Sequence, residues 1–252
     1  MARAGPFVSN LALTLALSGC QWLLTEPSGP GGGPGGGVGD AGTASDALAS
    51  PEPADASGSV FLRASWSNEQ RALEATLPLG TAIAATDIVI VTLRAKEHLA
   101  ETALTTLGAE WKHAVMNERG CGGSWTVLQM HRTGPPASPI AVQLDSVADF
   151  VMTGLAFGGA ASPTSVPPLQ RAGFDGDGWG RPAATTGLNS LLLLTFVDAT
   201  KTGPFGPLAG FERIDQGAIA HYHRSGSGSA GPFEVQGDPD GCGASSTFLL
   251  TP

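Results

Sequence analysis

The stretch Asp87-Ile88-Val89-Ile90-Val91-Thr92-Leu93 decides how the fold of this chain is interpreted. Its five consecutive β-branched residues favour an extended backbone, and a largely apolar run of this length is typical of a strand buried on both faces. A second run with the same character, which includes four consecutive leucines, covers residues 190–197. The sequence therefore predicts two central strands, one in each half of the chain.

The rest of the chain from residue 60 onward consists of short apolar runs separated by Gly, Pro, Asn and Asp. Few windows show the 3.6-residue stripe of an amphipathic helix, so a βαβ arrangement is not expected. Residues 67–76 fit either a helix start or an alternating strand, and the strand is preferred. The pattern predicts an all-β fold, an antiparallel β-sandwich. Its further strands are expected at residues 60–66, 111–116, 125–132, 140–144, 150–157, 219–223, 233–235 and 247–250.

Residues 1–19 combine one positive charge, Arg3, with a short apolar run and end in Leu17-Ser18-Gly19 before Cys20. This pattern resembles the signal peptide and lipobox of bacterial lipoproteins, and the apolar run is too short for a lasting transmembrane helix. The resemblance implies cleavage before Cys20 and lipid attachment to that cysteine. Gln21, where an Asp would favour retention in the inner membrane, points to the outer membrane.

Residues 20–59 contain the lipidation site and a low-complexity stretch of Gly, Pro, Ala, Ser and Asp. Such a composition cannot bury enough apolar surface to offset chain entropy, so a disordered tether is expected here. No later segment has about 18 uninterrupted apolar residues, and no other membrane crossing is expected. The remaining residues, 60–252, are assigned to one domain.

The domain carries motifs of a known kind. Leu77-Pro78-Leu79-Gly80, followed by Asp87 and its apolar run, resembles a β-sandwich domain of secreted bacterial and phage-tail-associated proteins. Further matches are Trp111 and the stretches 124–132, 151–159 and 185–194. The resemblance implies a jelly-roll-like sandwich in surface or adhesive contexts, and it brings no catalytic residues.

Charge and cysteine content restrict the partners and the compartment. The formal net charge is -9, and the chain lacks the basic clusters that phosphate binding requires, so nucleic acid is not an expected partner. With Cys20 lipidated, Cys121 and Cys242 remain as a pair outside the cytoplasm, where a disulfide is the default. Two separate buried thiols are the alternative.

Two patterns could bind a metal. In a strand, His221 and His223 point to the same face and could share an ion, although the solvent face of an edge strand is the preferred interpretation. Asp175 and Asp177, separated by glycine, could coordinate Ca²⁺ or simply form a tight turn. No other cofactor is expected.

No spacing of Ser, His, Asp or Cys singles out a catalytic constellation. The interpretation is a lipid-anchored cell-envelope protein on the periplasmic or extracellular face of the outer membrane, with a non-catalytic binding or adhesion domain for a glycan or a surface protein. The alternatives are a tethered hydrolase of polysaccharide or peptidoglycan, since fold does not determine chemistry, and a structural envelope component.

Overall fold

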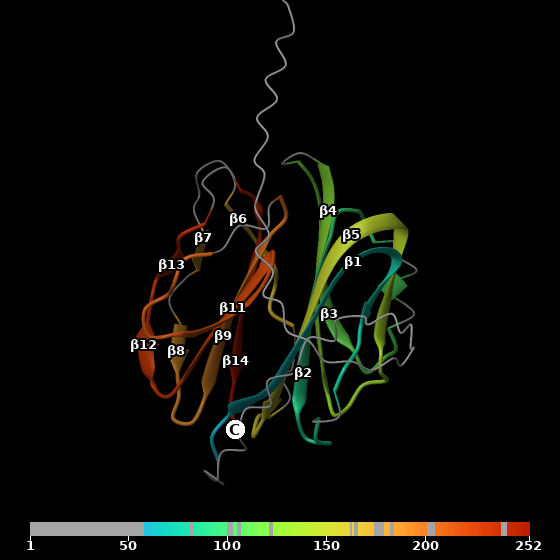
Figure 1. The fold of residues 1–252 in the computed structure, drawn as a ribbon. Coiled ribbons are helices and arrows are strands. Elements are labelled where there is room, and N and C mark those ends of the chain that lie inside the picture. Colours follow the sequence, from blue (N-terminus) through green and yellow to red (C-terminus); the bar gives the residue numbers. More distant parts are fainter. Residues whose placement is uncertain are drawn as a thin grey trace, which may run out of the picture. The chain divides into compact units, whose positions relative to one another are not determined.

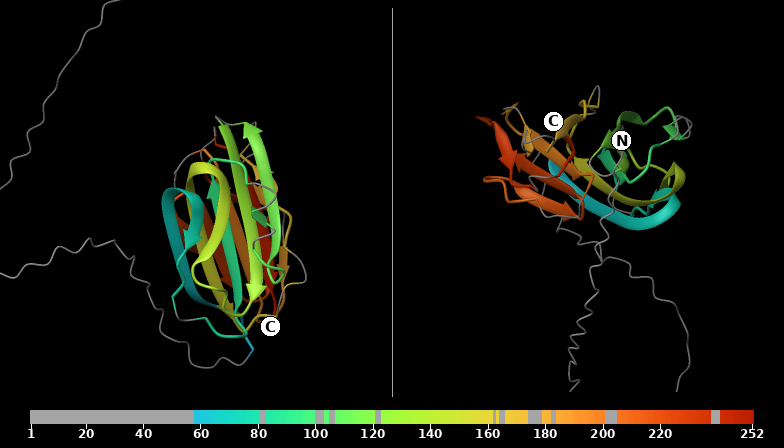
Figure 2. Two further views of the ribbon diagram at one scale, coloured as in Figure 1. Left: turned by 90° about the vertical axis from the view of Figure 1, so that its right-hand side faces the viewer. Right: turned by 90° about the horizontal axis from the view of Figure 1, so that it is seen from above.

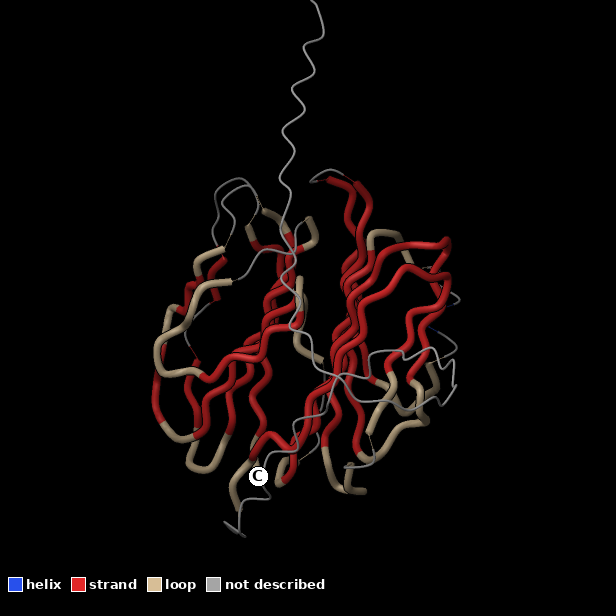
Figure 3. Tube along the Cα trace, viewed as in Figure 1, coloured by secondary structure: helices blue, strands red, loops and turns tan. Residues whose placement is uncertain are grey.

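The computed structural model describes residues 58–80, 83–99, 103–104, 107–120, 123–161, 163, 166–173, 179–181, 184–200, 205–237 and 241–252. The predicted signal peptide, the lipidation site and the predicted tether up to residue 57 therefore lie outside the described residues. The described part is built from antiparallel strands, which form two large sheets and two small ones (Figures 1 and 3). The described residues contain no helix long and apolar enough to cross a membrane.

The first sheet contains the first five strands of the chain in the order β1-β5-β2-β4-β3. The predicted all-β antiparallel class is confirmed here, and the buried run forms the central strand β2. The bounds of the strands are β1 Phe61–Leu77, β2 Ile88–Ala95, β3 Lys112–Gly120, β4 Gly123–Thr133 and β5 Ile140–Gly158.

The second sheet has the order β10-β11-β9-β14-β6, and two-stranded sheets pair β12 with β8 and β13 with β7. Its central strand β9 is buried along its whole length, as the run of leucines predicts. The bounds are β6 Gln170–Ala172, β7 Trp179–Arg181, β8 Ala184–Thr186, β9 Leu191–Asp198, β10 Glu212–Gln216, β11 Ile219–Ser225, β12 Gly228–Ala230, β13 Phe233–Val235 and β14 Gly243–Leu250.

The two large sheets pack face to face, as a β-sandwich requires (Figure 2). One shared cluster joins Ile88, Ile90 and Phe157 to leucines of the second sheet, and another joins Trp125 to Val197. The chain completes one sheet before it begins the other. This order does not show the jelly-roll arrangement that the resemblance implied.

The outer face of each large sheet is also covered. Strands β1 and β5 extend beyond the first sheet and pair with each other again from Glu74 to Leu77, after an irregularity that follows Ala72. This extension closes a cluster containing Val91, Leu128 and Met130. In the second sheet, β7 and β13 contribute to a cluster with Leu194 and Tyr222. Buried side chains on both faces explain why β2 and β9 are apolar without alternation.

Candidate functional site

A layer of polar side chains crosses the interface between the two large sheets, with apolar clusters on either side of it. In each sheet, the layer takes one residue from each of three neighbouring strands. Thr92 is paired with both Gln129 and Thr153, and Thr195 is paired in the same way with both His221 and Ser246. We call the following residues the polar layer: Thr92, Gln129, Thr153, Thr195, His221 and Ser246, all at most 1% exposed.

His221 on β11 connects the two sheets within this layer. Its Nε2 lies 2.9 Å from the Thr153 hydroxyl across the interface, and its Nδ1 lies 3.0 Å from the Thr195 hydroxyl on the neighbouring strand. The Thr153 hydroxyl donates to the Thr92 carbonyl, 3.4 Å away. It can therefore accept from Nε2–H, while Nδ1 accepts from Thr195. This arrangement needs a neutral imidazole.

Burial, with a smaller contribution from the neighbouring His223, lowers the pKa of His221 from 6.5 to about 3. A charged imidazole would lose its hydration inside the sandwich, and no carboxylate among the described residues contacts it. His221 therefore stays neutral at physiological pH and acts as a hydrogen-bonding link between the two sheets.

His223 lies two residues further along β11, near the surface. Its side chain is 10% exposed, and its Nε2 is 3.6 Å from a carboxylate oxygen of Glu212. Burial lowers the pKa of His223, and the negative charge of Glu212 opposes this shift. In the first sheet, His131 is buried and contacts the ring of Phe248 edge-on, at 5.9 Å between centroids.

The expectation that His221 and His223 could lie on the solvent face of an edge strand is wrong. Strand β11 lies between β10 and β9, and both imidazoles face the interior. The two ring nitrogens of His221 are at hydrogen-bonding distance from threonine hydroxyls. Across the part of the chain that the structure describes, no three His, Cys, Asp or Glu side chains gather as a metal site.

The other predicted site residues are only partly described. Cys20, Cys121, Asp175 and Asp177 lie outside the described residues. Cys242 is 1% exposed and immediately precedes β14.

The predicted Cys121–Cys242 disulfide stays a prediction, because Cys121 lies outside the described residues. Gly120 and Gly123 pair where β3 and β4 meet, on either side of Cys121. Trp125, two residues further along β4, shares a cluster with Ala244 of β14. The two segments that flank the cysteines therefore reach the same end of the sheet interface.

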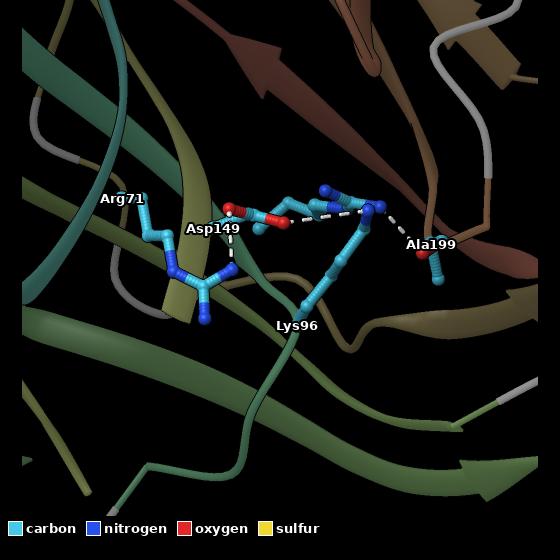
Figure 4. A network of polar contacts seen from close by, with 5 residues as sticks. Arg71, Lys96, Asp149 and Ala199 are labelled. Carbon is cyan, nitrogen blue, oxygen red and sulfur yellow. Dashed lines mark hydrogen bonds and ion pairs between the residues drawn. The ribbon is translucent and has the colours of Figure 1, made fainter. Parts of the chain in front are cut away.

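Sequence reasoning missed a second polar link between the sheets. Arg94 on β2 is 3% exposed, and its Nη2 donates to the carbonyl of Ala199, 2.6 Å away. Burial lowers its pKa, and Asp198 opposes this most strongly. Nearby, Asp149 lies 3.6 Å from both Arg71 and Lys96 (Figure 4). The available signal was an arginine one residue before the end of a mostly apolar strand.

The described site thus links two sheets through neutral and charge-assisted hydrogen bonds.

Comparisons of the chain with protein-family models, with curated proteins and with solved structures find no match.

Proposed function

We propose that this protein is a lipid-anchored component of the outer membrane whose β domain binds a ligand without catalysing a reaction. The lipobox that ends at Cys20 supports the anchor, and the low-complexity residues that follow support a tether. The expected ligand is a glycan or a surface protein on the periplasmic or extracellular side. The net charge of -9 argues against nucleic acid.

The proposal that the domain binds without catalysing a reaction depends on one observation, the position of His221. This residue belongs to the strongest candidate pair for metal or acid–base chemistry in the sequence. In the sandwich it is fully buried, and both ring nitrogens are close to threonine hydroxyls. A general base must instead reach the proton that it removes from a substrate. The imidazole serves the packing of the sheets, which leaves recognition to loops and strand edges.

The test is a ligand screen of residues 58–252 on a glycan array, together with titrations of Ca²⁺. We expect saturable binding to a defined glycan that persists in the His221→Gln variant. A parallel assay follows the release of soluble fragments from polysaccharide and from peptidoglycan. Release that is abolished in His221→Gln, while the variant keeps its fold, would replace the binding proposal with a hydrolase.

A further inference from the structure

The two large sheets have the same internal order. We number the five strands of each large sheet by their order along the chain. Read across the sheet from one edge to the other, both sheets then have the order first, fifth, second, fourth, third. In the first sheet these strands are β1, β5, β2, β4 and β3, and in the second they are β6, β14, β9, β11 and β10. Each neighbouring pair is antiparallel in both sheets.

The register of the central strands agrees as well. In each sheet, the first residue of the central strand (β2 or β9) pairs with a residue at or next to the end of each neighbouring strand, and the pairing then continues residue by residue. The opening pairs are Ile88 with Thr133 and Phe157 in the first sheet, and Leu191 with Ser225 and Leu250 in the second.

The turns that precede and follow equivalent strands use the same hydrogen bonds. The backbone N–H of Gly134 donates to the carbonyl of Asp87 at 2.8 Å, and that of Gly226 donates to Ser190 at 3.0 Å. Both glycines have a positive φ, 79° for Gly134 and 109° for Gly226, which few other residues adopt. The agreement between the two sheets therefore extends past the ends of these strands.

The segments that cover the outer faces also correspond. In the first half, Leu77 of β1 pairs with Ile140 of β5, and in the second half Arg181 of β7 pairs with Phe233 of β13. A proline precedes both Ile140 and Phe233. The second half therefore repeats the folded-over ends of β1 and β5 as separate short strands, and each half has its own outer cluster.

The two halves also share residues at equivalent positions at the ends of β4 and β11. His131-Arg132-Thr133-Gly134 corresponds to His223-Arg224-Ser225-Gly226. The guanidinium of Arg132 lies 5.7 Å from the ring centroid of Trp111, and that of Arg224 lies 5.2 Å from Phe211. Each aromatic residue immediately precedes the third main strand of its half.

We propose that residues 61–250 are two copies of one β unit, and that the inner face of this unit is a surface for pairing with a second copy of itself. The first copy is 61–158 and the second is 170–250. All described pairings of the large sheets stay within one copy. The copies meet through side chains of equivalent faces, which is the geometry of a two-fold symmetric interface.

The polar layer gives this proposal a sharp consequence. Under the two-fold relation, Gln129 takes the place of His221, and Ser246 takes the place of Thr153. Neither Gln129 Oε1 nor Ser246 Oγ has a hydrogen-bond partner in the described structure. An imidazole at position 129 should reach Thr92 and Ser246 as His221 reaches Thr195 and Thr153.

The experiment places Gln129→His, and the exchange variant Gln129→His/His221→Gln, in the full chain. We expect both to fold, with the pKa of the new imidazole at least one unit below 6.5 when followed by NMR. The control Leu128→His puts the same group on the opposite, apolar face of β4, and there we expect at least a hundredfold loss in the folding equilibrium constant. A Gln129→His variant as unstable as Leu128→His would overturn the equivalence.

A second measurement does not depend on these substitutions. A protease site inserted between residues 161 and 166 allows the full chain to be cut between the copies after folding. With any disulfide between the copies reduced, we expect the cut protein to sediment as one particle of unchanged mass, because no backbone pairing of the large sheets is broken. We also expect the two pieces to form that particle again when urea is diluted out. Loss of the near-UV circular dichroism signal on cutting would contradict a pairing surface between two complete copies.

Discussion

Lowering the pH perturbs His221 in a way that the structure quantifies. The folded state holds this imidazole neutral because burial lowers its pKa to about 3, whereas in the unfolded chain the pKa is near 6.5. Below pH 6.5 the unfolded state therefore binds a proton that the folded state does not bind, and the free energy of unfolding falls as the pH falls. The loss begins near pH 6.5 and stops near pH 3, where the folded state is protonated too.

The difference of about 3.5 pKa units corresponds to about 5 kcal/mol at most, of which about 2 kcal/mol is already lost at pH 5. The assay is urea unfolding at pH 7, 6, 5 and 4, followed by tryptophan fluorescence, for the wild type and for His221→Gln. Glutamine does not titrate, so the variant lacks this contribution, while His223 is present in both proteins. We expect the wild type to lose about 2 kcal/mol more than the variant between pH 7 and pH 5. Parallel pH profiles would refute the buried, neutral imidazole.

Two further substitutions test the packing of the second sheet. Gly243→Ala would place a Cβ atom against the carbonyl oxygen of Val197, well inside van der Waals contact, so we expect a loss of about 3 kcal/mol or more in the free energy of unfolding by urea. In the matched control Gly123→Ala, the new Cβ meets nothing within 4 Å, and a change below about 1 kcal/mol is expected; equal effects would contradict the close approach. Tyr222→Phe leaves the carbonyl of Gly206 without the hydroxyl that donates to it at 2.5 Å, and should cost about 1–2 kcal/mol in the same assay. An unchanged urea midpoint would show that this bond contributes nothing.

The strands themselves were largely predictable from the sequence. The runs at Ile88 and Leu191 became the fully buried strands β2 and β9, and residues 233–235 form β13 as expected. The expected strands at 140–144 and 150–157 are one strand, β5, because the polar residues between them, including Asp145 and Ser146, lie on an exposed irregular part of the same strand.

The site was less predictable, because burial of a polar residue depends on the partner sheet. The pattern around His221 correctly placed His223 on the same face, but alternation cannot tell which face turns inward when both are covered. The threonines that satisfy the imidazole come from β5 and β9, which are far from it along the chain. The strand order, in which β5 separates β1 from β2, is likewise set by long-range packing. Short strands such as β10 and β12 lacked an apolar run and were missed.

The proposed function depends most directly on the lipid anchor at Cys20. The deciding measurement is intact-mass and peptide mass spectrometry of the full-length protein recovered from the membranes of an expressing bacterium. We expect a mature chain that begins at Cys20 and carries acyl and diacylglyceryl groups on that residue. In a Cys20→Ala variant, we expect the protein to be lost from the membrane fraction. A chain that keeps residues 1–19, or that begins elsewhere without lipid, would contradict it.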